Sequence, residues 1–158
     1  MAQTSSISIR PAADRDLMAV ERLLETNKLP LVGVREAIDD FLVAERDGVV
    51  VGVIGLEIYD DRGLLRSAAV DGDERGTGVG ASLVGALIES ARARGLTELV
   101  LLTTTAEDWF PRFGFVAIAR DETPVAVRRS AEFKGACPAS AIVMQLNLGP
   151  TRTGRTGP

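Results

Sequence analysis

The sequence contains no histidine and a single cysteine among its 158 residues. Without histidine, the chain cannot build a Ser-His-Asp or Cys-His catalytic site, a His-ligated zinc site or an imidazole general base. One cysteine excludes an intrachain disulfide, CxxC redox chemistry and a thiolate metal cluster, so we expect no metal. Any chemistry must therefore use backbone dipoles, carboxylates, hydroxyls, arginines or a bound cofactor.

The sequence also lacks a long apolar run. The longest, residues 49–56, includes glycines and is too short to span a bilayer. Residues 1–9 lack the basic and apolar regions of a secretory signal. By elimination, we expect a cytoplasmic protein with no membrane partner.

Positive charge is scarce and is nearly all arginine. The formal net charge is −4, and the 18 basic residues include only two lysines, Lys28 and Lys134. An acidic chain argues against a nucleic-acid partner, because phosphate binding requires clustered basic residues. Arginine suits bidentate capture of carboxylates and phosphates, although a genomic bias towards arginine is the simpler explanation of the composition.

Length and composition fit one globular domain, which we assign to residues 1–148, with a disordered tail at 149–158. Periodicity predicts strands at residues 6–10, 41–46, 49–59, 64–70, 98–103, 115–118 and 139–148. It predicts helices after Asp14, at 34–39, from the glycine-rich loop to about Arg94, and at 106–113. The fold class is α/β (α+β), with one mixed, mostly antiparallel sheet of about seven strands and helices on both faces. Asp47-Gly48 predicts a tight hairpin turn, and Gly52 and Gly55 predict a bulge or a close backbone approach.

A glycine-rich loop, Arg75-Gly76-Thr77-Gly78-Val79-Gly80, lies between a predicted strand and a predicted helix. Its glycines permit positive φ angles and close approach, and its amides lie at the positive end of the helix dipole. This arrangement favours a pyrophosphate site, with Arg75 as an added donor; a plain strand-to-helix connection is the alternative. The loop lacks the Gly-Lys-Ser/Thr ending of a P-loop. It also follows an antiparallel meander, where a dinucleotide fingerprint would follow the first strand of a βαβ unit.

In this context the loop resembles the acetyl-CoA pyrophosphate loop of the GNAT superfamily of N-acetyltransferases, whose pattern Arg75, Gly78 and Gly80 fit. A second family motif, Asn-x-x-Ala-x-x-x-Tyr-x-x-x-Gly-Phe, is matched in place by Thr103, Ala106, Phe110, Gly114 and Phe115. The resemblance covers roughly residues 6–148. Within the family, residues 64–70, 103–107 and 131–140 resemble the arsenic-resistance branch, which is similar to amino-acid N-acetyltransferases of the N-acetylglutamate synthase type.

The resemblance implies acetyl-CoA as co-substrate and direct attack of a substrate amine on its thioester. The implied acceptor is the amine of an amino acid or a glutamate-like small molecule, with an organoarsenical analogue as one alternative. In the family, the third meander strand supplies backbone groups to the cofactor, and the splay after it admits the cofactor; here the N–H of Val70 becomes the oxyanion donor. The implied cofactor-binding residues are Ala69, Val70, Arg75, Gly76, Thr77, Gly78, Val79, Gly80, Ala81, Thr103 and Phe110.

Two departures from the family pattern concern proton transfer. The tyrosine that often protonates the departing thiolate is replaced by Phe110, which leaves water as the proton source. The position of a family glutamate base is Leu64, and Glu57 on the preceding strand is the nearest replacement, acting through a water. An exposed strand carboxylate is the alternative interpretation of Glu57.

Arginines are the candidate substrate ligands. Strand alternation puts Arg66 on one face with Leu64 and Ala68, where it could hold a substrate carboxylate; a salt bridge at the sheet surface is the alternative. Arg35 is the second candidate, in a helical segment where this fold commonly builds its acceptor site. For Arg128 and Arg129, as for Arg35, solvated surface charge is the simpler interpretation. Cys137 is expected to be a small buried hydrophobe rather than a nucleophile.

Two other functions remain open from the sequence. The missing tyrosine favours a non-enzymatic acyl-CoA-binding sensor on the same fold, and a protein N-acetyltransferase is the third alternative. Relatives of this fold often pair, so a homodimer is an open expectation.

Overall fold

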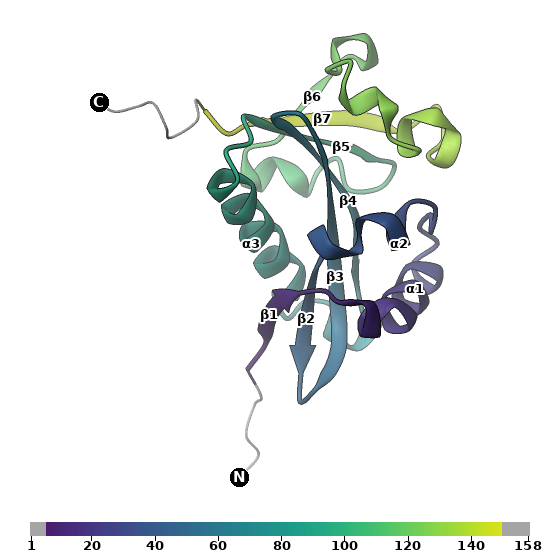
Figure 1. The fold of residues 1–158 in the computed structure, drawn as a ribbon, viewed down its shortest axis with the longest axis vertical. Coiled ribbons are helices and arrows are strands. Elements are labelled where there is room, and N and C mark those ends of the chain that lie inside the picture. The colour runs from purple at the N-terminus through teal and green to yellow at the C-terminus, as the bar shows by residue number, and fades with distance from the viewer. Residues whose placement is uncertain (1–5, 150–158) are drawn as a thin grey trace, which may run out of the picture. The chain divides into compact units, whose positions relative to one another are not determined.

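The computed structural model describes residues 6–149, so most of the tail predicted at 149–158 lies outside the described residues. Its strands are β1 (Ser8–Pro11), β2 (Leu42–Arg46), β3 (Val49–Tyr59), β4 (Arg62–Val70), β5 (Glu98–Thr103), β6 (Val116–Ile118) and β7 (Ile142–Asn147). Its α-helices are α1 (Leu17–Thr26), α2 (Val34–Ala37) and α3 (Val79–Ala93). The strands form one mixed sheet, as the sequence predicted, and the structure gives their order as β1-β2-β3-β4-β5-β7-β6 (Figure 1). None of the helices among these residues is long and apolar enough to cross a membrane.

The chain forms two compact units. The first, here called the N-terminal unit, comprises the described part of residues 1–55 together with 67–87. The second, here called the C-terminal unit, comprises residues 56–66 and the described part of 88–158. The chain passes from one unit to the other within β3, β4 and α3.

In the N-terminal unit, the β2–β3 hairpin turns where the sequence predicts it. Asp47 and Gly48 both have positive φ, +55° and +80°, the geometry of the two-residue turns that match strand twist. A register shift between Ala44 and Glu45 makes a bulge close to Gly52. The bounds of β3 agree with the prediction of a strand at residues 49–59.

Helices cover both faces of β3 in the N-terminal unit. Val53 belongs to a core with buried residues of α1 and α2, whereas a Cβ on Gly52 would lie 2.9 Å from Leu83 of α3. Neighbouring strand residues point to opposite faces, so α3 packs on the face opposite α1 and α2. Gly55 lies on the α1 side, where a Cβ would come within 2.4 Å of the ring of Phe41. The predicted close approach at both glycines is confirmed.

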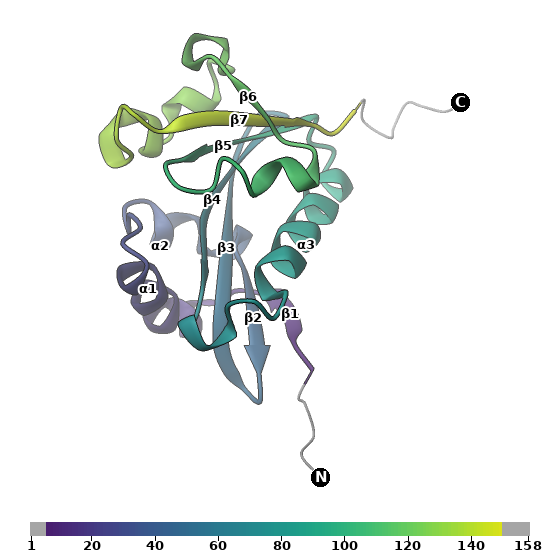
Figure 2. The same cartoon turned by 180° about the vertical axis from the view of Figure 1, so that it is seen from behind.

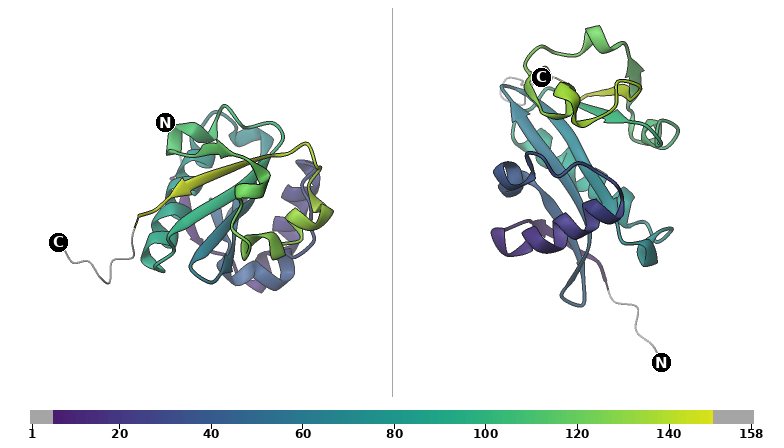
Figure 3. Two further views of the ribbon diagram at one scale, coloured as in Figure 1. Left: turned by 90° about the horizontal axis from the view of Figure 1, so that it is seen from above. Right: turned by 90° about the vertical axis from the view of Figure 1, so that its right-hand side faces the viewer.

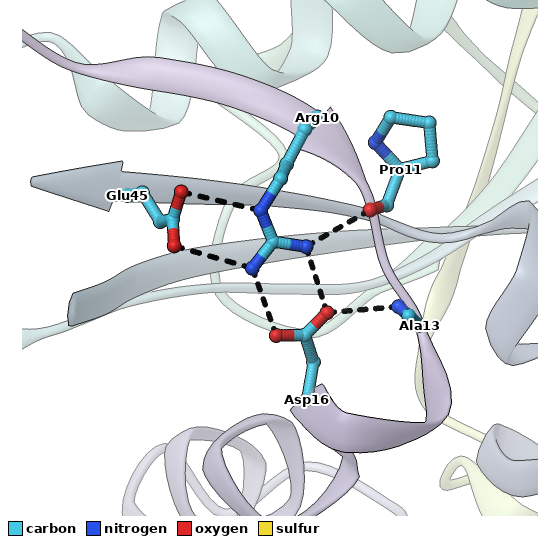
Figure 4. Close-up of polar contacts among 5 residues, drawn as sticks. All are labelled: Arg10, Pro11, Ala13, Asp16 and Glu45. Atoms are coloured by element: carbon cyan, nitrogen blue, oxygen red, sulfur yellow. Dashed lines mark hydrogen bonds and ion pairs between the residues drawn. The ribbon is translucent and has the colours of Figure 1, made fainter. Parts of the chain in front are cut away.

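A network centred on Arg10 connects β1 to β2 and to the turn before α1 (Figure 4). Arg10 on β1 donates to both oxygens of Asp16, at 2.8 and 2.9 Å, and to both oxygens of Glu45 on β2, at 3.2 Å. The buried Asp16 also accepts the Ala13 N–H at 2.8 Å. The helix predicted after Asp14 begins at Leu17, and Asp14 instead begins a single 3₁₀ turn (Asp14–Asp16).

The C-terminal unit is built around β5, whose bounds the sequence predicted. β5 is parallel to β4 at Arg62–Leu64 and antiparallel to β7 along its whole length. β6 pairs with the other edge of β7 (Figure 2), and Figure 3 follows these strands from two further sides. A buried core links these strands to the segment before β7 through Leu64, Val100, Val127 and Val143.

Three sequence predictions were wrong in this unit. The helix predicted at 106–113 is only a 3₁₀ turn at Phe110–Phe113, because Pro111 cannot donate to a longer helix and Gly114 ends the turn at φ +101°. The last strand begins at Ile142 rather than at residue 139. Between β6 and β7, the sequence predicted no element, yet the chain forms short turns at Arg120–Glu122, Val127–Arg129 and Glu132–Ala136.

Candidate active site

The glycine-rich loop joins the end of β4 to α3 in the N-terminal unit. The amides of Glu74, Arg75 and Thr77 close its turns, bonding to carbonyls of residues 71, 72 and 74. Gly76 and Gly78 have φ of +82° and +90°, so both occupy the left-handed region that favours glycine. No heavy atom lies within 4 Å of where a Cβ would stand on either glycine. The left-handed φ, rather than close packing, therefore explains the glycines.

The first turn of α3 offers backbone donors. Ser82 donates to Gly78 at 3.0 Å, so the amides of Val79, Gly80 and Ala81 precede the first hydrogen bond of the helix. The side chain of Val79 is buried, while Ala81 is exposed. Amides at the positive end of a 15-residue helix are backbone groups that could hold an anion in an acidic chain.

Arg75 stands next to these amides and is held from another element. Its guanidinium donates to Oδ1 of Asn27 at 2.8 Å, and Asn27 donates its amide nitrogen to the carbonyl of Leu23 at 2.8 Å. The second bond fixes which way the Asn27 amide faces. The exposed Arg75 side chain is therefore positioned by the end of α1.

Ala69 and Val70 end β4 in the same unit. Ala69 is buried in the core, Val70 is half-buried, and the next amide, Asp71, donates to Val51 at 2.8 Å. Ser67 has a φ of +59°, which interrupts the alternation of β4. The predicted shared face of Arg66 and Ala68 was wrong, because Arg66 is buried and Ala68 is exposed on either side of this residue.

A buried ionic cluster lies in the C-terminal unit around Arg66. The Arg66 side chain is fully enclosed, with NH1 2.7 Å from Oε2 of Glu57 and Nε 3.5 Å from Oε2 of Glu132. The phenol of Tyr59 donates to the other oxygen of Glu57 at 2.6 Å. Both oxygens of Glu57 therefore accept a hydrogen bond, and the carboxylates of Glu57 and Glu132 balance the charge of Arg66.

The two carboxylates of the cluster differ in electrostatic environment. Burial raises the pKa of Glu57, but hydrogen bonds from Tyr59, Ser130 and Arg66 outweigh it, and the pKa lies below its ordinary value. Burial raises the pKa of Glu132 above its ordinary value despite the opposing charge of Arg66. Burial and the negative charge of Glu132 raise the pKa of the Cys137 thiol to about 12, so Cys137 stays protonated. Glu132 is thus the carboxylate whose charged form is the less stabilised.

The other sequence candidates have their own partners. Arg35 is exposed and donates to both oxygens of Glu21, at 3.0 and 3.1 Å. Arg128 donates to the carbonyls of Thr123 and Asp121, and Arg129 pairs with Asp60 at 3.7 Å. In the C-terminal unit, Thr103 accepts the Ala106 N–H at 2.9 Å, and the buried Phe110 packs edge-on against Trp109 and Phe115.

Sequence reasoning missed Tyr59 and Glu132. Alternation along β3 puts Tyr59 on the same face as Glu57, so that signal was available. Nothing in the pattern around Glu132 indicates its contact with Arg66, which depends on the tertiary fold. Within residues 6–149, no three Asp, Glu or Cys side chains are grouped so that they could hold a metal ion.

The family model described as the acetyltransferase (GNAT) family matches residues 11–127, which include both the glycine-rich loop and the β4 strand before it. The chain belongs to the GNAT acetyltransferase family.

Individual relatives agree with this membership. An amino-acid acetyltransferase from Mycobacterium tuberculosis is 35% identical over 127 residues, covering 74% of this chain and 71% of that protein. An amino-acid acetyltransferase from Neisseria meningitidis is 29% identical over 144 residues, 85% of this chain but 33% of that protein. A solved N-acetylglutamate synthase from Neisseria gonorrhoeae, complexed with coenzyme A and N-acetyl-glutamate, superposes with a TM-score of 0.79 at 26% identity. That match covers 93% of this GNAT chain and 36% of the synthase, so the chain spans about a third of these longer enzymes.

Proposed function

We propose that this protein is an acetyl-CoA-dependent N-acetyltransferase that acts on the amine of an amino acid or a glutamate-like small molecule, carried by a single domain over residues 1–148. The observation that carries the proposal is the loop with glycines at positive φ that opens α3 inside the matched family region. The named relatives act on amino acids, and the structural relative holds coenzyme A, which supports the choice of both substrates.

The cofactor side of the proposal uses backbone groups. The amides of Val79, Gly80 and Ala81 and the guanidinium of Arg75 would hold the diphosphate, and the loop residues Gly76, Thr77 and Gly78 would approach it closely. The N–H of Val70 would donate to the thioester oxygen as it becomes an oxyanion. Ala69, Thr103 and Phe110 complete the cofactor-binding set that the family resemblance implies.

The reaction would be direct transfer. The neutral amine attacks the thioester carbon, the tetrahedral intermediate collapses, and coenzyme A leaves as a thiolate that takes a proton from water. Positioning of the two substrates and oxyanion stabilisation would supply most of the rate.

Proton removal from the amine is the demanding step for this chain. Glu57 would act through a water, but its lowered pKa and two occupied oxygens weaken it as a base. Together with Phe110 in the place of the family tyrosine, this favours a second candidate function, an acyl-CoA-binding sensor without turnover. The third alternative, acetylation of a protein amine, has no specific observation in its favour.

Arg66 is the proposed ligand for the acceptor carboxylate, with Arg35 as the second choice. Arg66 could take a substrate carboxylate by releasing Glu132, whose contact of 3.5 Å is longer than the 2.7 Å contact to Glu57. Arg66→Lys keeps the charge but loses the bidentate fork. We expect it to raise KM for the amino acid about tenfold and to leave KM for acetyl-CoA unchanged.

The test is release of coenzyme A thiol from acetyl-CoA with a panel of amino acids that includes glutamate and its phosphinic and arsinic analogues. Release with an α-amino acid supports the enzyme, and release with the arsinic analogue would support the arsenic-resistance branch. Arg75→Glu should abolish acetyl-CoA binding, since it places a negative charge where the diphosphate would sit. Binding without release for any amine would support the sensor, and unchanged binding in Arg75→Glu would refute the cofactor site. The cytoplasmic location, the absence of a nucleic-acid partner and the homodimer stay predictions.

A further inference from the structure

The loop that would hold the diphosphate carries unfavourable charge of its own. Asp71, Asp73 and Glu74 immediately precede Arg75. Carboxylates this close to a bound diphosphate repel it, unless each is neutralised or turned to another partner. The Asp71 carboxylate already accepts the Asp73 N–H at 2.9 Å. Glu74 is adjacent in sequence to Arg75, so its charge matters most.

Glu74 is met by an arginine from a distant part of the N-terminal unit. Arg46, at the end of β2, donates from Nε and NH2 to the two oxygens of Glu74 at 2.9 and 3.1 Å. The side chains are 22% and 12% exposed, so the pair is largely removed from solvent. The hydrogen bonds from Arg46 hold the pKa of Glu74 below its ordinary value, so Glu74 is ionised at neutral pH.

The same pair also reaches the glycine turn. The hydroxyl of Thr77 lies within hydrogen-bond distance of the backbone carbonyl and of Oε1 of Glu74, the latter at 3.2 Å. Thr77 stands between Gly76 and Gly78, the two residues with left-handed φ. Arg46, Glu74 and Thr77 therefore form a chain of contacts from the β2–β3 hairpin to the turn before α3.

We propose that Arg46 is a positioning residue for the cofactor that acts through Glu74: its guanidinium neutralises the Glu74 carboxylate, which contacts Thr77 in the glycine turn that would face the diphosphate. This proposal rests on the proposed function, because it assumes a CoA ligand. It gives the β2–β3 hairpin a role in cofactor affinity although the hairpin supplies no group to the cofactor. Arg75 remains the arginine that would contact the diphosphate, and Arg46 would act through Glu74.

Two roles of Arg46 make opposite predictions for a double variant. If Arg46 masks charge, Arg46→Gln leaves Glu74 unpaired beside the diphosphate, and CoA binding weakens about tenfold or more. The double variant Arg46→Gln/Glu74→Gln then removes the repelling charge, and its affinity for CoA returns to within about threefold of wild type. If the pair is only a brace for the hairpin, the double variant binds as weakly as Arg46→Gln.

The experiment measures the Kd of CoA by calorimetry for wild type, Arg46→Gln, Glu74→Gln and the double variant, at low and high salt. The expected result is weak binding by Arg46→Gln alone, a smaller deficit at high salt, and near wild-type binding by the other two variants. Acetylpantetheine, which lacks the diphosphate, should be used equally well by all four proteins. Arg62→Gln is the matched control, because it breaks an arginine–glutamate pair, with Glu98 at 2.7 Å, in the C-terminal unit.

The outcomes separate this inference from the proposed function. No CoA binding by the wild type would refute the proposed function itself. Wild-type binding with an unaffected Arg46→Gln, or a double variant as weak as Arg46→Gln, would overturn the positioning role and leave the function standing. If Arg46→Gln does not fold, Arg46→Lys keeps the charge and loses the fork; masking predicts that its affinity for CoA stays within about threefold of wild type. An Arg46→Lys deficit as large as about tenfold would overturn the inference.

Discussion

At the residue scale, Tyr59 is the informative side chain because it is the chain's only tyrosine. The family tyrosine that protonates the thiolate is absent at Phe110, and Tyr59 does not replace it chemically. Burial and the hydrogen bond to Glu57 raise the pKa of Tyr59 to about 12. A phenol this weakly acidic gives up its proton to a thiolate less readily than an ordinary tyrosine does.

This single tyrosine permits a direct titration. The ultraviolet absorbance of tyrosinate should show a midpoint near pH 12 in the folded protein, against 10.0 for an ordinary tyrosine. In Glu57→Gln the acceptor is uncharged, so the midpoint should move part of the way back, with burial accounting for the rest. Because the folded pKa is raised, the associated stability is complete below pH 10 and is lost as pH rises through 12.

The urea-unfolded protein is the reference for that titration, since its tyrosine should titrate as a solvated phenol. Coincident curves for wild type and Glu57→Gln would show that the Tyr59–Glu57 hydrogen bond does not control the pKa.

At the element scale, the sequence pattern predicted what local rules determine. The Asp47-Gly48 turn, the bounds of β3 and the end of α3 follow from turn residues and periodicity, and the bounds of β5 follow from a near-continuous apolar run. The segment from 119 to 141 follows no period, because its turns are held by tertiary contacts. Arg120, for example, donates to the carbonyls of Ala139 and Ala141 at 3.3 and 3.2 Å. Alternation along β4 failed beyond Arg66 for a different reason, the left-handed backbone at Ser67.

Alanine substitutions at two glycines, one in a strand and one in a helix, should change the free energy of unfolding in opposite directions. Gly55→Ala puts a Cβ within 2.4 Å of the fully buried Phe41 ring, and we expect a loss of about 1–3 kcal/mol from overpacking. Gly85→Ala, inside α3 with nothing within 4 Å of the added Cβ, should gain about 0.5–1 kcal/mol of helix stability. Urea unfolding of both variants measures the two changes. Equal effects of the same sign would show that helix or strand propensity, rather than the Phe41 contact, controls Gly55.

At the scale of the whole molecule, the glycine-rich loop and the Arg66 cluster differ in how far the sequence could predict them. The residues of the glycine-rich loop are contiguous in sequence, so their spacing alone predicts a diphosphate-binding loop. The Arg66 cluster joins Glu57 on β3 to Glu132 in an aperiodic segment, and no local signal connects them. The net charge of −4, which the sequence gives directly, also limits how an anionic ligand can bind. An anionic ligand must bind through local donors rather than through the field of the protein.

Ligand binding should therefore appear in the stability of the entire chain. A ligand that binds only the folded protein raises the free energy of unfolding, by about 2.7 kcal/mol at a concentration one hundred times its Kd. We expect acetyl-CoA to do so in urea unfolding of wild type and of Arg62→Gln, and not of Arg75→Glu. Arg75 is exposed, so its substitution should change the unliganded stability little, and the lost increment reports binding alone. If acetyl-CoA raised the free energy of unfolding of Arg75→Glu by the full amount, the anion site would have to lie elsewhere than the loop. Because an enzyme and a sensor both bind the cofactor, this measurement tests the site they share, and thiol release then separates them.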